Sequence, residues 1–207
     1  MGFFKRIFGC EKKEETPKVK THDPVDGWGR EEAPEPTEIQ EKVAEKVPVY
    51  YVAALEEMGV EETPGEEHTP RVLEYLKTVG LGEDDETPWC SAFMNWCVIQ
   101  EHRGDDGDYY YEGKMHPADS LSHKVGTGRA NARSWLGWGK EVSRSEARKG
   151  DVVVLWRGSP RSWKGHVGIF EGWSGNKVML LGGNQGNKVT IAAYPSVRVL
   201  SIRRQIR

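Results

Sequence analysis

The spacing of apolar residues changes once along this chain, at Gly150, and that change restricts the fold more than any other feature. Before Gly150, apolar residues recur at helical spacing, and after it they form short alternating or β-branched runs joined by Gly- and Asn-rich connections, as in antiparallel strands. Helices first and strands afterwards predict an α+β fold, with the helices packed on an antiparallel sheet of about five strands. The expected helices cover 49–59, 68–81, 90–99 and 130–139, and the expected strands cover 151–156, 166–173, 177–183, 188–194 and 197–204.

The first part of the chain has a different composition from the rest. Residues 11–47 are charged, poor in apolar side chains and interrupted by four prolines, which predicts a flexible linker before a folded domain at 48–207. Residues 1–10, MGFFKRIFGC, predict an amphipathic end that contacts a membrane or another protein, the alternative being a frayed terminus. They lack the apolar core of a secretory signal, so we expect the chain to be cytoplasmic when it is made.

Composition excludes several classes of protein. The net charge is −3, whereas nucleic-acid binders usually carry a basic domain or stripe, so we expect no nucleic-acid partner. Three cysteines in 207 residues do not make a disulfide-stapled secreted domain. No run approaches the roughly 20 apolar residues of a membrane span.

The segment 86–97, ETPWCSAFMNWC, carries two of the three cysteines. On a helix, the seven positions from Cys90 to Cys97 correspond to roughly 10 Å, whereas a disulfide needs Cα atoms within about 7 Å. A shared metal ion is no easier at that separation. We therefore expect the two cysteines to act independently.

Cys90 and Cys97 differ in their surroundings. Pro88 keeps the preceding residue out of helical geometry, so the helix must begin near Cys90. A thiol in the first turn lies at the positive end of the helix dipole, which favours thiolate, and the unpaired N–H groups there could hold an oxyanion. Cys97 lies in the middle of the helix and is expected to be a small core residue.

A thiolate nucleophile needs a base, and His166 is the candidate among six histidines. In GHVGIF, the alternation puts His166, Gly168 and Phe170 on one face of a strand, and glycines leave space around the imidazole. The alternative is a hydrogen-bonded histidine with no role in catalysis.

Taken together, these segments resemble a known family. WCSAF at a helix start, then KGDVVVLW, then GHVGIF is similar to the papain-like cysteine hydrolases of the NlpC and CHAP type, which cleave peptidoglycan amide bonds. The likeness is greatest to a group of uncharacterised, often phage-associated proteins of that superfamily, and it covers about residues 49–194. The matching runs are PGEEHTPRVLEY, DETPWCSAFMNWC, GTGRANARSWLGWG, GDVVVLWRGSPRSWKGHVG and LGGNQGN.

The resemblance implies a catalytic set. It implies Cys90 as the nucleophile, His166 as the base and a polar residue on the next strand that orients the imidazole. LGGNQGN offers Asn184 or Gln185 for this third position, and we take Asn184, as in papain-like enzymes, with Gln185 as a substrate contact. The alternative for this segment is ordinary turn chemistry.

Three further features bear on ligands. Trp89 and Trp163 are candidates for stacking on sugar rings, and Trp163 is the stronger one because it lies in a polar segment before His166. The polar segment 105–128 is expected to be a loop, and its part 105–125 is longer than in the family and would serve as a lid or a partner-binding insertion. The acidic runs at 83–86 and 105–108 could bind calcium, although neither fits an EF-hand and exposed acidic runs are usually only solvated.

The sequence therefore predicts a peptidoglycan hydrolase that cleaves stem-peptide amide bonds by a Cys–His thiol mechanism. This chemistry requires no metal or organic cofactor. The enzyme would reach the cell wall after release from the cell or as part of a virion. The alternatives are a catalytically silent structural or adaptor protein of the same fold, or a thiol amidohydrolase with other substrates.

Overall fold

The computed structural model describes residues 47–65 and 67–206. They belong to one compact unit, Glu45–Arg207. The expectations for residues 1–10 and for the charged segment up to residue 46 lie outside the described residues. In the part of the chain that is described, no helix has the length and apolar character needed to cross a bilayer.

Within residues 47–206, as far as they are described, four α-helices precede the large sheet. Pro70 occupies the first position of its helix, as predicted, and Gly80 follows that helix with a φ of +73°. The Cys90 helix is buried along its whole length, so it forms the centre of the domain. The helices are α2 (Val49–Glu56), α3 (Pro70–Lys77), α4 (Cys90–Ile99) and α5 (Ala118–Val125), with short 3₁₀ segments η1 (Gln100–His102), η2 (Ala132–Gly137), η3 (Arg144–Glu146) and η4 (Ser196–Arg198).

The large sheet is antiparallel and has six strands in the order β3-β8-β4-β5-β6-β7, which confirms an α+β layout. We expected about five strands, and the strand that was missed is β3. This edge strand has three residues, of which only Val142 is buried, so it is too short for an alternation to be visible in the sequence. The strands are β3 (Lys140–Val142), β4 (Val152–Trp156), β5 (Gly165–Ser174), β6 (Lys177–Gly182), β7 (Thr190–Pro195) and β8 (Val199–Arg204).

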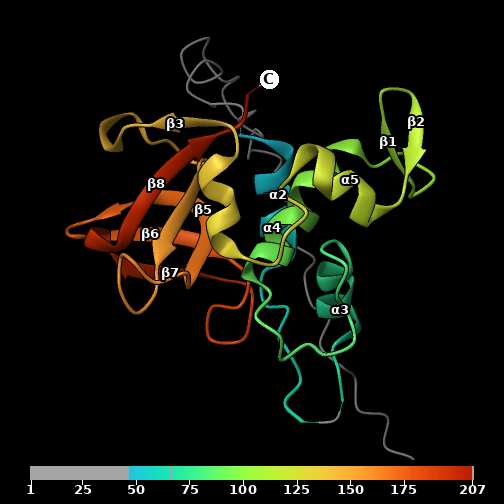
Figure 1. The fold of residues 1–207 in the computed structure, drawn as a ribbon, viewed down its shortest axis with the longest axis horizontal. Helices are drawn as coiled ribbons and strands as arrows, with labels where there is room; N and C mark the ends of the chain where they lie inside the picture. Colours follow the sequence, from blue (N-terminus) through green and yellow to red (C-terminus); the bar gives the residue numbers. More distant parts are fainter. Residues whose placement is uncertain (1–46, 66, 207) are drawn as a thin grey trace, which may run out of the picture. The chain divides into compact units, whose positions relative to one another are not determined.

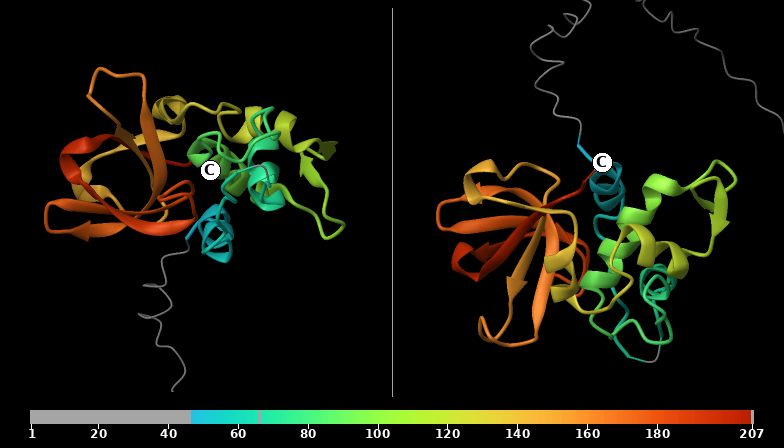
Figure 2. Two further views of the ribbon diagram at one scale, coloured as in Figure 1. Left: turned by 90° about the horizontal axis from the view of Figure 1, so that it is seen from below. Right: turned by 45° about the horizontal axis from the view of Figure 1, so that its top comes forward.

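Both faces of this sheet are buried. Val167 and Ile169 face the helices and join the larger apolar cluster with α4. Phe170, on the opposite face, belongs to a smaller cluster within the sheet itself. Figure 2 shows how the strands curve round that second face, and register shifts in β4 and β5 accompany the bend. The sheet is therefore covered by helices on one face and curved round its own apolar cluster on the other.

The segment after α4 is not the loop that the sequence predicted. It forms a small hairpin, β1 (Tyr109–Tyr111) and β2 (Lys114–His116), followed by α5, and the hairpin projects away from the large sheet (Figure 1). Its turn residues Glu112 and Gly113 both have positive φ, 51° and 74°, as a two-residue type I′ turn requires. The polar composition concealed this turn because its two flanking strands have only three residues each.

Candidate functional site

The helix α4 begins at Cys90 and packs against β5 and β6. The sulfur of Cys90 lies among backbone N–H donors, its own, that of Ser91 and that of Val167. The ladder between β5 and β6 begins at Ile169 and Leu181, so Val167 lies beyond its end and its N–H faces the sulfur instead. The nucleophile candidate therefore lies at the end of the β5–β6 ladder and faces the N–H of Val167, the residue after His166 on β5.

Polar side chains of α4 hold the segment 127–132 in place beside Cys90. Ser91 donates its hydroxyl proton to the carbonyl of Arg129 over 2.6 Å and accepts from Trp135 Nε1 over 2.9 Å. Asn95 Oδ1 accepts from the N–H groups of Thr127 and Gly128 over 2.8 and 2.9 Å. These bonds fix the segment 127–132 against the helix, and Ser91 is fully occupied in doing so.

Trp89 is a core residue and not a stacking platform, which corrects the sequence-based expectation. Its side chain has no exposed surface, and Nε1 donates to Glu62 Oε2 over 2.9 Å. A Cβ added at Gly183 would lie 2.3 Å from the indole ring, so this position accepts only glycine. Trp89, the residue before the candidate nucleophile, is thus anchored between the end of β6 and the segment at Glu62.

His166 is the second residue of β5 and is 4% exposed. Its Nε2 lies 3.1 Å from Gln185 Oε1. The Gln185 amide nitrogen donates to the carbonyls of Leu180 and Thr190, so its oxygen is the atom that must face the imidazole. Nε2 therefore carries the proton and donates it, and Nδ1 is the unprotonated, basic nitrogen of the neutral ring.

The orienting residue is thus Gln185, where we expected Asn184. Asn184 has a φ of 55°, and its side-chain amide lies 3.1 Å from Trp89 Nε1 and 3.2 Å from Trp89 N. With its oxygen toward those two donors it accepts from Trp89 N and shares the single indole proton with Glu62, and it makes no hydrogen bond to His166. Gln185, which we expected to contact substrate, is only 6% exposed, and its side chain holds the histidine instead. The hydrogen bond to His166 that we expected from Asn184 is thus made by the neighbouring Gln185.

Tyr194 on β7 is a neighbour of His166 that sequence reasoning missed. Its hydroxyl oxygen lies 3.4 Å from His166 Nε2, and the two rings lie 5.2 Å apart at 38°. The ladder places Tyr194 opposite Val178, at the far end of β6 from Gly182, so the curvature of the sheet brings it to His166 and not the pairing alone. The alternation in TIAAY could have indicated an inward side chain, but not its partner.

Two cavities flank the pair. A cleft of about 460 Å³ opens at Cys90, and a smaller cavity of about 210 Å³ lies beside His166. Arg157 lines both, and Trp163, 72% exposed, lines the cleft as a stacking residue would. The cleft is lined by Pro88, Cys90, Ala130, Asn131, Ala132, Arg157, Gly158, Trp163, Lys164 and Gly165, and the cavity by Leu155, Trp156, Arg157, His166, Asn184, Gln185, Gly186, Tyr194 and Arg198.

Burial controls the protonation states of the candidate pair. Desolvation raises the pKa of the Cys90 thiol, although the N–H of Val167 and the charge of Arg157 oppose this. Desolvation also lowers the pKa of His166 to about 4, against the hydrogen bond that the imidazole donates to Gln185. Thiol and imidazole are therefore both neutral at pH 7, and no hydrogen bond joins them, which differs from the thiolate that the helix dipole alone would favour.

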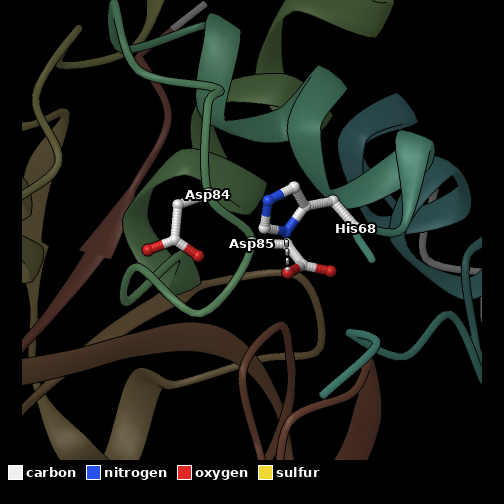
Figure 3. Close-up of side chains that lie close together, drawn as sticks. All are labelled: His68, Asp84 and Asp85. Atoms are coloured by element: carbon white, nitrogen blue, oxygen red, sulfur yellow. Dashed lines mark hydrogen bonds and ion pairs between the residues drawn. The ribbon is translucent and has the colours of Figure 1, made fainter. Parts of the chain in front are cut away.

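The acidic run at 83–86 gives one cluster with metal-ligating side chains, His68, Asp84 and Asp85 (Figure 3). Asp85 is fully buried, and its carboxylate accepts from His68 Nδ1 and from the N–H groups of Thr63 and Thr69. Asp84 Oδ1 accepts from the N–H of Glu86. With these acceptors in use, the cluster ties the lead-in of α4 to the start of α3 and does not fit a calcium site.

Comparison with solved structures gives a distant likeness in fold. No family model matches the chain, and no curated protein matches it. Among solved structures, it is similar to the crystal structure of the P60 domain from an M. avium subspecies paratuberculosis antigen, with 17% identity over 76% of this chain and 93% of that chain and a TM-score of 0.40. A likeness this distant carries no inference about the chemistry of this chain.

Proposed function

We propose that this chain is a cysteine hydrolase of the papain-like NlpC/CHAP type that cleaves amide bonds of peptidoglycan stem peptides. The observation that carries the proposal is the tautomer of His166. Gln185 holds the proton on Nε2, which leaves Nδ1 as a base on the strand residue next to Val167, whose N–H faces the Cys90 sulfur. A buried amide with three hydrogen bonds has a clear use here only if the orientation of the imidazole matters.

The proposed reaction follows from these groups. The Cys90 sulfur attacks the amide carbonyl while the thiol proton moves to His166 Nδ1. The backbone N–H groups at the start of α4, free of intrahelical partners, stabilise the oxyanion of the tetrahedral intermediate. The C–N bond then breaks, His166 returns the proton to the leaving amine, and water hydrolyses the thioester. Trp163 at the rim of the cleft would stack on the substrate.

Because thiol and imidazole are both neutral at pH 7, proton transfer accompanies attack and no preformed ion pair is needed. Peptidoglycan as the substrate, like action on the cell wall after release or from a virion, rests on the sequence resemblance. Digestion of purified peptidoglycan tests the proposal. The wild-type chain should release fragments whose masses correspond to cleavage at an amide bond, and Cys90→Ala should release none. Release by Cys90→Ala at the wild-type rate would refute it.

A second candidate is a catalytically silent structural or adaptor protein with the same fold. The absence of a hydrogen bond between the Cys90 thiol and His166, in the described part of the chain, favours this alternative. Alkylation by iodoacetamide near neutral pH separates the two. A nucleophilic Cys90 is modified ahead of Cys97, which has no exposed surface, whereas a silent site leaves Cys90 as inert as Cys97.

A further inference from the structure

The cleft at Cys90 is cationic although the chain as a whole is acidic. Among the described residues, Arg157 and Lys164 are the only charged ones that line it, and the smaller cavity adds Arg198. No Asp or Glu of this part of the chain lines either cavity, while the whole chain has a net charge of −3. Positive charge has therefore been gathered at the one surface where the proposed chemistry takes place.

Arg157 is the residue best placed to use that charge. It follows β4 directly, and its N–H donates to the carbonyl of Lys164 over 3.2 Å, which closes the loop 157–164. Arg133 donates to the carbonyls of Pro160 and Lys164 over 3.0 and 3.3 Å and so holds the same loop. These bonds fix the loop backbone from which Arg157 extends, and Arg157 lines both cavities.

Nearby carboxylates do not neutralise Arg157. Within the described residues, no ion pair and no side-chain hydrogen bond engages Arg157 or Lys164. The acids that precede Cys90 are turned elsewhere, since Asp85 is occupied by His68 and two backbone N–H groups, and Glu86 Oε1 accepts from the N–H of Gly65. The charge of Arg157 nevertheless acts on Cys90, His166 and Tyr194.

We infer that the substrate carries a carboxylate close to the scissile amide and that Arg157 binds it. The site thus takes an acidic peptide in preference to a neutral one. A guanidinium matches a carboxylate with two parallel hydrogen bonds, whereas Lys164 at the rim supplies a point charge that attracts the same group. A bound carboxylate would also offset the positive charge beside His166, which favours the protonated imidazole during the reaction. This inference rests on the proposed function of Cys90.

Two small alkylating reagents test the charge preference without any peptide substrate. Iodoacetate and iodoacetamide differ only in that one is an anion and the other is neutral. Their rates of reaction at Cys90 in the full chain can be followed by peptide mass spectrometry. The rate with iodoacetate divided by the rate with iodoacetamide is then normalised by the same ratio for 2-mercaptoethanol. We expect this normalised ratio to exceed one, by about two- to fivefold at low salt, and to fall toward one in 1 M NaCl.

Variants assign the effect to Arg157. Arg157→Gln should remove most of the preference and leave only the part that Lys164 supplies, and Arg157→Lys should retain more of it. Arg161→Gln is the matched control, since Arg161 is exposed in the same loop but lines neither cavity, and it should keep the wild-type ratio. A wild-type ratio of one or less, or a ratio that Arg157→Gln leaves unchanged, would overturn the inference.

If Cys90 reacts with neither reagent, the proposed function is contradicted. A binding experiment then tests the anion site separately. The full chain with Cys90→Ala can be titrated with acetyl-Ala-Glu-Ala amide and with its Gln counterpart while the NMR signals of the tryptophan indoles are followed. Tighter binding of the Glu peptide that Arg157→Gln abolishes supports the anion site. Equal binding of the two peptides refutes it.

Discussion

The state of His166 predicts how stability depends on pH. Burial lowers the pKa of His166 from 6.5 to about 4 in the folded chain, so between these pH values the unfolded chain binds a proton that the folded chain does not. Stability therefore falls as the pH falls from 6.5 to 4, with no contribution of this kind above 7. At about 1.4 kcal/mol per pH unit, the loss is about 2 kcal/mol by pH 5 and about 3 kcal/mol by pH 4.

Urea denaturation of wild type and His166→Gln at pH 7, 6, 5 and 4 measures this loss. Gln cannot titrate, so the stability difference between the two proteins isolates His166 from carboxylates that also titrate in acid. The wild type should lose its advantage over His166→Gln by about 3 kcal/mol from pH 7 to pH 4. His123→Gln is the control, an exposed position on α5, and should follow the wild type. A difference between wild type and His166→Gln that does not change with pH would refute a buried, neutral His166.

Three further predictions concern separate parts of the site. Cys97→Ala should lower the unfolding free energy by about 1–2 kcal/mol and leave turnover nearly intact, because Cys97 is a buried core residue, and loss of activity in the folded variant would give it a chemical role. Gln185→Leu should lower kcat about ten- to a hundredfold and more than Asn184→Ala does, and the reverse order would restore Asn184 as the orienting residue. EDTA should leave the melting temperature unchanged, whereas Asp85→Asn should lower stability by about 1–3 kcal/mol, and a chelator-dependent melting temperature would contradict the structural role of Asp85.

Much of the fold could be predicted from periodicity. The helix at Cys90 was identifiable because Pro88 limits where it can begin and because its apolar residues recur at helical spacing. The five longer strands were identifiable from their alternation. β3 and the hairpin β1–β2 were missed because three-residue strands leave no period to detect, and the type I′ turn at Glu112 and Gly113 does not use the usual Asn-Gly pair.

The site was predictable in its segments but not in its contacts. Sequence patterns brought attention to Cys90 and His166, each at the start of its own element. They could not distinguish Asn184 from Gln185 as the partner of His166. The partner depends on which of the two side-chain amides the end of β6 directs toward β5. Trp89 was misread for the same reason, since a tryptophan beside a nucleophile can face solvent or core. Arg157 and Tyr194 join the site only through loop closure and strand order, which no local pattern records.

The central claim is that Cys90 and His166 act as one unit in amide hydrolysis. The most direct measurement is the rate at which wild type, Cys90→Ala, His166→Ala and the double variant release peptide fragments from purified peptidoglycan, each shown to be folded by cooperative thermal unfolding. The account predicts that both single variants lose activity by comparable factors and that the double variant is scarcely worse than either. Fragment release by Cys90→Ala, or losses that multiply in the double variant, would contradict it.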